Sequence, residues 1–109
     1  MLEKQYRLPA TTRLKNYDLF DSQAFSLKIA KNNLKTSRFG FVIGKKTDKR
    51  ATTRNRIRRV FRSCIEEMFS EIKTGHDMLF FLKSGILEIK RKELYNQVYD
   101  FLKEKDLII

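Results

Sequence analysis

The residues best suited to chemistry lie in one stretch, from Lys45 to Arg62. It holds nine basic side chains against one acidic side chain, Asp48, and so carries +8 of the chain's net +11. A surface that only keeps a protein in solution mixes charges of both signs. The concentration of one sign therefore predicts a polyanionic partner. The basic members are Lys45, Lys46, Lys49, Arg50, Arg54, Arg56, Arg58, Arg59 and Arg62.

Arginine outnumbers lysine in this stretch, and the two side chains bind anions differently. The planar guanidinium group can hold two phosphate oxygens or stack on a base, whereas an ammonium group acts as a point charge. A solvated helix face usually interleaves acidic and basic residues four positions apart, yet no acidic residue occurs between Lys49 and Ser63. Contact with an RNA or DNA backbone is therefore favoured over a merely solvated helix face.

An amphipathic helix must position most of these arginines. Between residues 51 and 72 the apolar residues recur every three or four positions, which is typical of one side of a helix. At about 100° per residue the opposite side carries the polar set Asn55, Arg56, Arg59, Arg62 and Ser63. Gly75 suits the left-handed conformation that often follows a helix end. The sequence thus predicts one helix with a core side and a basic side.

The remaining elements suggest a small α/β domain. Residues 25–29 and 39–43 alternate apolar and polar or small side chains and are predicted to form a hairpin of two strands. The apolar run 78–82 predicts a covered strand, and 88–105 predicts a second amphipathic helix. Residues 1–22 show no clean period and are expected to form an irregular N-terminal arm. The order predicts an α/β two-layer sandwich with helices on one face of the sheet.

Gly40 and Gly44 fall on one face of the second predicted strand. A glycine leaves the backbone bare, either for close packing or for approach by a ligand. The sequence leaves both interpretations open.

Composition excludes several other classes. A chain of 109 residues, 41% hydrophobic and without an apolar run near 18 residues, predicts a single domain over 1–109 and no membrane-spanning helix. Residues 1–10 carry three charges and a proline, so no cleavable secretory signal is expected and the cytoplasm is the expected location. One cysteine and one histidine cannot supply a disulfide or a zinc site, and no metal site or catalytic acid/base pair is expected in this chain.

Three segments resemble the bacterial ribonuclease P protein subunit. Lys45-Lys46, Ala51 and then Arg54-Asn55-Arg56-Ile57-Arg58-Arg59 with Arg62 are similar to that family's Arg-Asn-Arg signature. The run from Arg38 to Lys46 resembles its third strand, and the run from Gly75 to Phe81 resembles its fourth. The resemblance covers about residues 6–102. It implies a fold like the second domain of ribosomal protein S5, in the order αβββαβα, with a mixed sheet of about four strands and a left-handed βαβ crossover.

The resemblance also implies a division of labour. In this family the RNA subunit holds the catalytic Mg²⁺ ions and removes the 5′ leader of precursor tRNA, and the protein assists without breaking a bond. The implied partners are one catalytic RNA per chain and precursor tRNA, with no membrane. The residues implied to contact the catalytic RNA are Lys45, Lys46, Arg50, Arg54, Asn55, Arg56, Arg58, Arg59 and Arg62.

The resemblance implies a second surface, a sheet face that guides the single-stranded leader. Ser26 and Lys28 are the candidates on the strand, and Tyr17 and Phe20 are the aromatic residues that the arm offers in place of the family's N-terminal helix. Many members carry an aromatic residue where this chain has Lys28, so leader contacts are expected to be more electrostatic here.

Two alternative functions remain at this stage. A structural ribosomal or general RNA-binding protein would share the charge but not a preference for leader-bearing tRNA. A protein-only endonuclease would need a metal site or an acid/base pair. His76 and Cys64 do not supply one, because the first is expected at the entrance of a strand and the second inside an apolar stripe.

Overall fold

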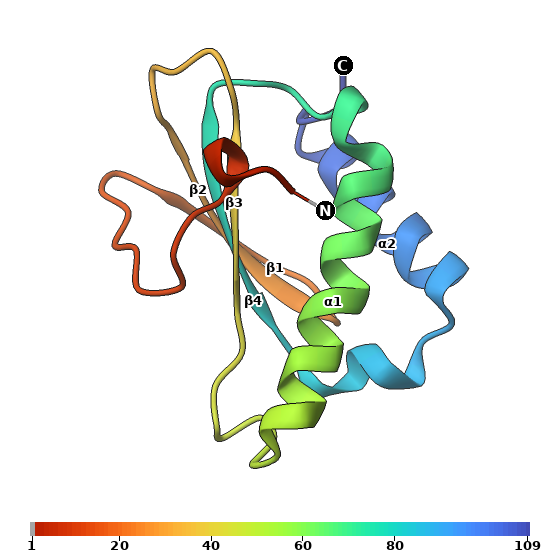
Figure 1. The fold of residues 1–109 in the computed structure, drawn as a ribbon. Coiled ribbons are helices and arrows are strands. Elements are labelled where there is room, and N and C mark those ends of the chain that lie inside the picture. Colours follow the sequence, from red (N-terminus) through yellow and green to blue (C-terminus); the bar gives the residue numbers. More distant parts are fainter. Residues whose placement is uncertain (1) are drawn as a thin grey trace.

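The computed structural model describes residues 2–109; Met1, the first residue of the expected arm, lies outside the described residues. Short 3₁₀ turns occur at Lys4–Tyr6, Phe69–Glu71 and Ser84–Glu88. The main elements follow one another from the N-terminus as in Figure 1: β1 (Asp18–Asp21), β2 (Phe25–Lys31), β3 (Arg38–Val42), α1 (Ala51–Met68), β4 (His76–Leu82) and α2 (Arg91–Glu104).

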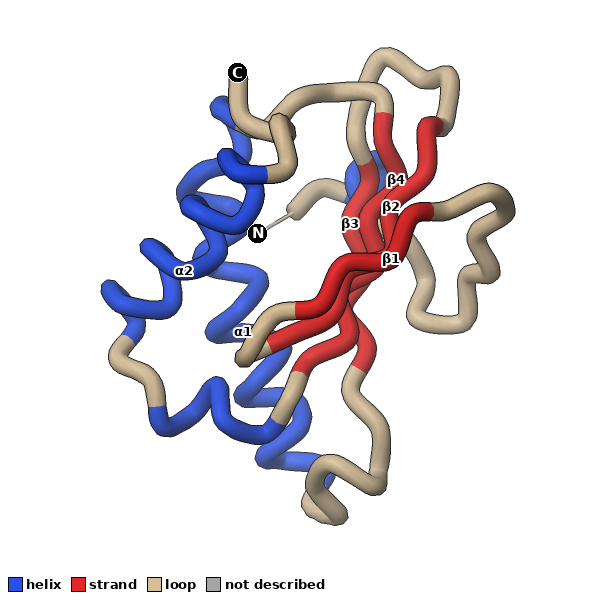
Figure 2. The backbone as a smooth tube through the Cα atoms, turned by 180° about the vertical axis from the view of Figure 1, so that it is seen from behind, coloured by secondary structure: helices blue, strands red, loops and turns tan. Residues whose placement is uncertain are grey.

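The strands form one sheet, in the order β1-β2-β4-β3, and both helices lie on the same side of it (Figure 2). β1 and β2 pair antiparallel, β2 and β4 pair antiparallel, and β3 and β4 pair parallel. We call the covered side the helix face and the other side the open face. This two-layer α/β arrangement confirms the predicted fold class, with the α1 helix connecting the two parallel strands.

The predicted hairpin between residues 25–29 and 39–43 is wrong. Both segments are strands, but β4 lies between β2 and β3, so these two strands do not pair. The polar segment between them does reverse the chain, with Asn33 at φ 58°. The two strands that it joins are nevertheless separated by the width of one strand, which β4 occupies. The actual hairpin joins β2 to β1, and β1 falls within the expected irregular arm. A strand of four residues with an aspartate at each end has no apolar alternation that would reveal it.

Four phenylalanine rings form the centre of the core between sheet and helices. Phe80 of β4 lies 5.6 Å from Phe25, 5.9 Å from Phe41 and 5.0 Å from Phe61 of α1, measured between ring centroids. Aromatic pairs at such distances add stabilisation beyond the area that they bury. The predicted core sides of both helices are confirmed by their buried residues: Ile57, Phe61, Cys64, Ile65 and Met68 in α1, and Leu94, Val98 and Leu102 in α2.

The N-terminal segment adds a short stretch of chain beside β3. Arg7 forms a parallel bridge with Phe39, and the Leu8 amide donates to the Phe39 carbonyl at 2.8 Å. Leu8 then packs against Gly40, where an added Cβ would lie 2.5 Å from a Leu79 methyl carbon and 3.0 Å from the Leu8 carbonyl oxygen. Close packing therefore explains Gly40. In place of the family's first helix, this segment contains the 3₁₀ turn Lys4–Tyr6.

An ion pair between a buried aspartate and a partly exposed arginine ties β3 to β4 on the open face. Asp77 accepts hydrogen bonds from Arg38 Nε at 2.9 Å, from Arg38 Nη2 at 2.7 Å and from Asn32 Nδ2 at 2.9 Å. Burial acts to raise the pKa of Asp77, but these hydrogen bonds outweigh it and hold the pKa below its ordinary value. Its charged form is therefore the one that stabilises the fold.

We expect Asp77→Asn to lower the free energy of unfolding by about 1–2 kcal/mol at neutral pH, a modest loss because Arg38 is partly exposed. A carboxyl whose folded pKa is depressed stabilises above its unfolded pKa, about 3.9, and loses that contribution as the pH falls through the folded value. Urea unfolding at several pH values should therefore show the two proteins converging below about pH 4. A difference that stays constant with pH would contradict this assignment.

Candidate nucleic-acid interface

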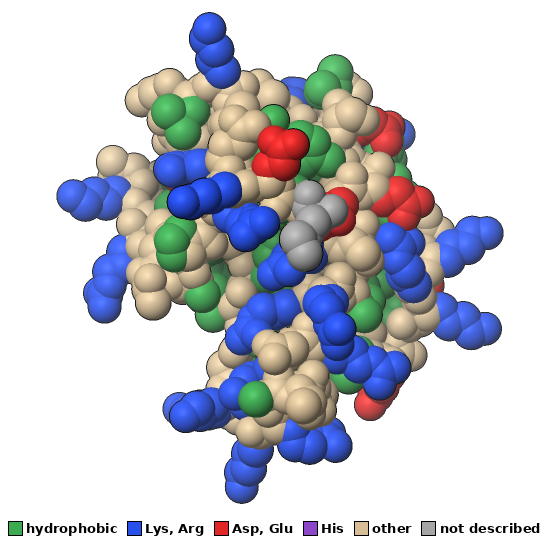
Figure 3. Space-filling model, viewed as in Figure 1, with side chains coloured by type: hydrophobic (Ala, Val, Ile, Leu, Met, Phe, Trp, Pro, Cys, Tyr) green, Lys and Arg blue, Asp and Glu red, His purple; other side chains and the backbone are tan. Residues whose placement is uncertain are grey.

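The α1 helix carries its arginines outward because its apolar residues face the sheet. Arg59 lies opposite the stripe of buried residues and is exposed. Figure 3 shows Lys and Arg side chains crowded around the start of α1 and the loop before it. Lys45 and Lys46 are exposed in that loop, next to Gly44, whose Cβ position is open. The predicted basic side of the helix is thus confirmed as a surface.

One flank of α1 forms a hollow of about 450 Å³, which we call the arginine hollow. The Arg58 guanidinium donates to the Asn55 side-chain oxygen at 2.6 Å, which fixes both side chains. The Arg62 guanidinium lies 5.6 Å from the Phe41 ring centroid, so an aromatic face orients it. Three guanidinium groups held around one concavity provide the donors that phosphate oxygens require. The residues lining the hollow are Thr52, Asn55, Arg58, Arg59 and Arg62.

Arg7 extends this surface and was missed from the sequence. It is exposed and lines a second depression together with Arg58 and Arg62, at the edge of β3. The Arg7 Nε donates to the Leu2 carbonyl at 2.8 Å, which holds the side chain against the N-terminal segment. No signal in the sequence could place Arg7 there, because long-range contacts bring the N-terminus beside α1: the bridge from Arg7 to Phe39 and the hydrogen bond from the Leu2 amide to the Glu66 side chain at 2.8 Å.

Two of the predicted RNA-contacting arginines also shape the loop before α1. Arg54 Nη1 donates to the Asp48 and Lys49 carbonyls at 2.8 and 2.9 Å. The Arg50 side chain forms an ion pair with Asp48 at 3.2 Å, and the hydrogen bonds from Arg50 lower the pKa of Asp48. Arg50 is still 74% exposed and can reach a ligand. The main structural role of Arg54 is therefore to hold the loop in place.

Arg56 lies on the other flank of α1, apart from the arginine hollow. That flank also carries Ser63, whose Oγ lies 3.2 Å from Arg91 Nε of α2. Arg56 is exposed and forms no ion pair with any described residue. The predicted contact residues therefore surround the exposed ridge of the helix rather than form one row.

The open face carries a cluster of rings around a lysine. The Lys28 ammonium lies 4.7 Å from the Tyr17 ring centroid and 5.1 Å from that of Phe81. Phe81 was missed as a site residue, although alternation within the apolar run places it on the face opposite Phe80. The structure thus joins Tyr17 and Lys28, as predicted, and adds Phe81.

Ser26 shares the open face with Lys28, and its hydroxyl is occupied. The Ser26 Oγ donates to Asp21 at 2.5 Å, and Lys83 Nζ forms an ion pair with the same carboxylate at 3.0 Å. The hydrogen bond from Ser26, and then that from Lys83, lowers the pKa of Asp21. Ser26 therefore lies where the sequence predicts, and Lys83 neutralises the acidic group beside it.

Phe20 does not lie with the other three candidates for leader contact. It pairs with Leu27 in the sheet register, so its side chain points to the helix face. There its ring lies 6.4 Å from Phe101 and 4.8 Å from the Lys105 ammonium. Its place in the cluster with Ser26, Lys28 and Tyr17 is corrected, because three residues along a strand reverse the side-chain direction.

The side chains that could hold a metal ion lie apart from one another in the described part of the chain. Among residues 2–109 no three His, Cys, Asp or Glu side chains lie together as a metal site would need. His76 Nδ1 lies 3.0 Å from the Thr74 carbonyl oxygen, and burial raises the pKa of the Cys64 thiol. None of the helices in the described part of the chain is long and apolar enough to span a membrane.

Comparisons with known proteins agree on one family. The family model for ribonuclease P matches residues 5–106. A ribonuclease P protein component from Synechococcus is 36% identical over 73 residues, which are 67% of this chain and 55% of the relative. One from Marinomonas is 35% identical over 86 residues, 76% of this chain and 64% of the relative. The match thus spans less than two thirds of either relative's length.

Solved structures show the same fold at lower identity. The RNase P protein of Staphylococcus aureus matches with a TM-score of 0.76 and 20% identity, over 97% of this chain and all of that chain. The RNase P protein of Thermotoga maritima matches with a TM-score of 0.74 and 20% identity, over 82% of this chain and 84% of that chain.

Proposed function

This chain belongs to the ribonuclease P protein family, and on that premise we propose that it is the protein subunit of ribonuclease P. In this role it binds the catalytic RNA and the 5′ leader of precursor tRNA and assists removal of the leader. The observation that carries the proposal is the arginine hollow, which gathers Asn55 of the Arg-Asn-Arg segment with Arg58, Arg59 and Arg62 within the span that the family model matches. The cytoplasm, where precursor tRNA is processed in bacteria, is the compartment that this role requires.

The arginine hollow suits the backbone of a folded RNA. Arg58 and Arg62 are already oriented by Asn55 and Phe41, so little side-chain freedom is lost when they bind phosphates. Arg59 and Arg56 extend from the exposed ridge to either side. Backbone contacts of this kind position an RNA without reading its sequence. We therefore assign this surface to the catalytic RNA, with one chain per RNA.

The open face suits a single strand. Tyr17 and Phe81 offer ring surfaces, and Lys28 between them offers a charge for a phosphate. Rings and charges in one shallow surface are typical of proteins that bind single-stranded nucleic acid. We assign this cluster to the leader of precursor tRNA.

The proposed reaction divides between RNA and protein. The catalytic RNA would hold the Mg²⁺ ions that activate the attacking water. This chain's residues bind and orient: the arginines fix the RNA, and the open face holds the leader in line with the cleavage site. By neutralising phosphates, the protein lowers the concentration of Mg²⁺ that the assembly needs.

Reconstitution tests the proposal. The cognate catalytic RNA with the full chain should process precursor tRNA at a low Mg²⁺ concentration at which the RNA alone is nearly inactive. The assembly should also bind precursor tRNA more tightly than mature tRNA. Equal activity with and without the chain would refute the proposal. Binding without preference for precursor would instead indicate a structural ribosomal or general RNA-binding protein, and cleavage by the chain alone would indicate a protein nuclease.

Exchange of Lys28 tests how the leader is held. We expect Lys28→Ala to weaken binding of precursor tRNA by about fivefold at low salt. It should also lower the slope of log affinity against log salt by about one unit, the share of one phosphate contact. Lys28→Tyr should also reduce the salt dependence, but it should keep the affinity because a base can stack on the new ring, a contact worth roughly 1–3 kcal/mol. Fluorescence anisotropy over a salt series measures both effects. Lys35→Ala, in the exposed turn after β2, is the control and should change neither.

A further inference from the structure

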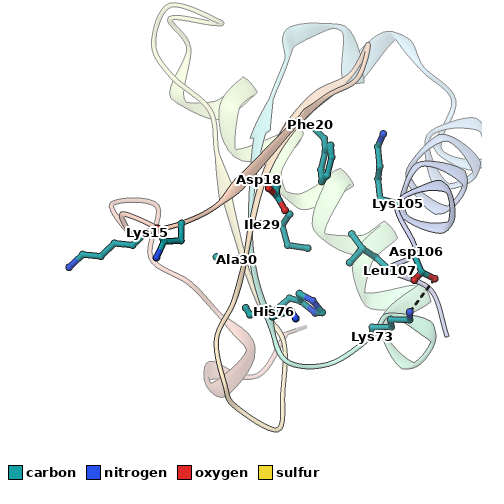
Figure 4. Close-up of a pocket in the computed structure, with 12 residues that line it drawn as sticks. Lys15, Asp18, Phe20, Ile29, Ala30, Lys73, His76, Lys105, Asp106 and Leu107 are labelled. Carbon is teal, nitrogen blue, oxygen red and sulfur yellow. Dashed lines mark ion pairs between the residues drawn. The ribbon is translucent and has the colours of Figure 1, made fainter.

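A further cavity lies across the β1 strand from the open face. It has a volume of about 770 Å³ and opens on the helix side of the sheet, between β1, the end of β2 and the chain after α2 (Figure 4). We call it the lysine cavity, because Lys31, Lys73 and Lys105 reach it from three separate segments. Lys15 also borders it, with a side chain that points away from the interior in Figure 4. Neither of the surfaces assigned above includes these residues.

Two carboxylates, Asp18 and Asp106, also line the cavity and balance part of the positive charge of its lysines. Asp106 forms an ion pair with Lys73 at 3.1 Å, drawn as a dashed line in Figure 4. Asp18 lies at the start of β1 and forms no ion pair with any described residue. Lys31 and Lys105 have no carboxylate partner within the described chain either, so two ammonium groups face one unpaired carboxylate.

The same pair of groups, an aromatic ring and an ammonium, occurs on both sides of β1. On the open face Lys28 lies 4.7 Å from the Tyr17 ring centroid. In the lysine cavity Lys105 lies 4.8 Å from the Phe20 ring centroid. Tyr17 and Phe20 are three residues apart, and Leu19 between them is 59% exposed. β1 is an edge strand, so no further strand separates the two pairs.

We propose that the lysine cavity binds single-stranded RNA that continues from the open face around the edge of β1. The Phe20 ring takes a base, and Lys31 and Lys105 take phosphates. A space of this size holds a short piece of strand, on the order of two nucleotides. This inference rests on the proposed function, because it extends the leader path beyond the cluster around Lys28.

The two carboxylates favour RNA over an acidic peptide as the occupant. Asp18 and Asp106 can accept hydrogen bonds from ribose 2′-hydroxyl or base amino groups, which RNA supplies. An acidic peptide would place further carboxylates beside them and would be repelled. A flat ring beside an ammonium also matches the alternation of bases and phosphates along a strand.

The test compares precursor tRNAs that carry short and long leaders, bound to the holoenzyme. The wild-type holoenzyme should bind precursor tRNA more tightly as the leader is lengthened, once the leader is long enough to reach around β1 into the lysine cavity. The double variant Lys31→Ala/Lys105→Ala should lose this gain by about fivefold to tenfold and should bind the short-leader precursor normally. The matched control Lys35→Ala/Lys92→Ala removes the same charge from exposed positions and should keep the gain.

Crosslinking provides a measurement that needs no variant. Precursor tRNAs with 4-thiouridine at successive leader positions should crosslink first to the open face and then, from positions further upstream, to residues of the lysine cavity. No crosslink to the cavity from any position, or equal losses in both double variants, would overturn the proposal. Displacement of the long leader by an oligoglutamate peptide, with tight peptide binding that the Lys31→Ala/Lys105→Ala variant loses, would assign the cavity to an acidic protein and would also overturn it.

The outcomes separate this inference from the function on which it rests. If the inference alone fails, the holoenzyme still prefers short-leader precursor over mature tRNA but gains nothing from a longer leader. If the proposed function fails, that preference is itself absent.

Discussion

Replacing Arg58, Arg59 and Arg62 together by alanine should weaken binding of the catalytic RNA by about 1,000-fold or more. Each guanidinium that loses a phosphate gives up a charge-assisted hydrogen bond, worth about 1.5 kcal/mol or more, and each 1.4 kcal/mol is a factor of ten. The three side chains line one hollow, and the structure places Arg58 and Arg62 against fixed neighbours. Their loss should therefore remove the central contact rather than a peripheral one.

The salt dependence of RNA binding distinguishes direct phosphate contacts from a general attraction by net charge. The triple variant should lower the slope of log affinity against log salt by about two to three units, close to one unit for each lost phosphate contact. The matched control Lys35→Ala/Lys92→Ala/Lys103→Ala removes the same charge from exposed positions and should change the slope little. Equal effects in the two triple variants would show that only net charge matters and would contradict the assignment of the hollow.

Single substitutions resolve the two flanks of the helix. Arg56→Ala and Arg59→Ala should each weaken RNA binding and lower the salt slope by about one unit. Arg54→Ala should act through the loop before α1 instead, because Arg54 donates hydrogen bonds to the Asp48 and Lys49 carbonyls of that loop. We infer that Arg54 serves binding indirectly, by fixing the loop that presents Lys45 and Lys46.

The helices were predictable from the sequence because their packing is set by near neighbours in the chain. The apolar residues of α1 recur at helical spacing, and the structure buries Ile57, Phe61 and Cys64 as that spacing requires. The opposite basic side follows from the same geometry. The segment from Arg54 to Arg62 thus predicts both the helix and its basic side in one local pattern.

The order of the strands was not predictable in the same way. Alternation in 25–29 and 39–43 reveals which side chains face the core, and these sides are confirmed by the buried Phe25, Leu27 and Phe39. It does not reveal which strand lies alongside, because hydrogen bonds between strands involve the backbone alone. The insertion of β4 between β2 and β3 depends on residues more than thirty positions away.

The candidate site was predictable where it lies on one element and not where several meet. The arginines of α1 are predictable from their spacing, whereas Arg7 reaches the same surface through long-range contacts of the N-terminal segment with β3 and α1. The sequence groups Phe20 with Tyr17 because it gives no signal for the strand β1. Side chains alternate between the two faces along a strand, so two residues three positions apart point to opposite faces.

Two adjacent phenylalanines in β4 should behave in opposite ways when replaced. Phe80 is fully buried and touches three other rings, whereas Phe81 is half-buried on the open face beside Lys28. Phe80→Ala should lower the free energy of unfolding by about 3–5 kcal/mol, because it removes a large apolar side chain and leaves a cavity. That is a large share of the total stability of a small domain, and the melting temperature should fall by roughly 15 °C or more.

Phe81→Ala should lower the free energy of unfolding by no more than about 1 kcal/mol, since the ring is partly in water. It should instead weaken binding of precursor tRNA by about threefold to tenfold, without changing the affinity for mature tRNA, because a base loses its stacking surface. Thermal unfolding and anisotropy measured on both variants test the pair. If Phe81→Ala binds precursor as tightly as the wild type, the rings of the open face do not contact the leader. Destabilisation by Phe81→Ala equal to that by Phe80→Ala would contradict the half-buried position of the Phe81 ring beside Lys28.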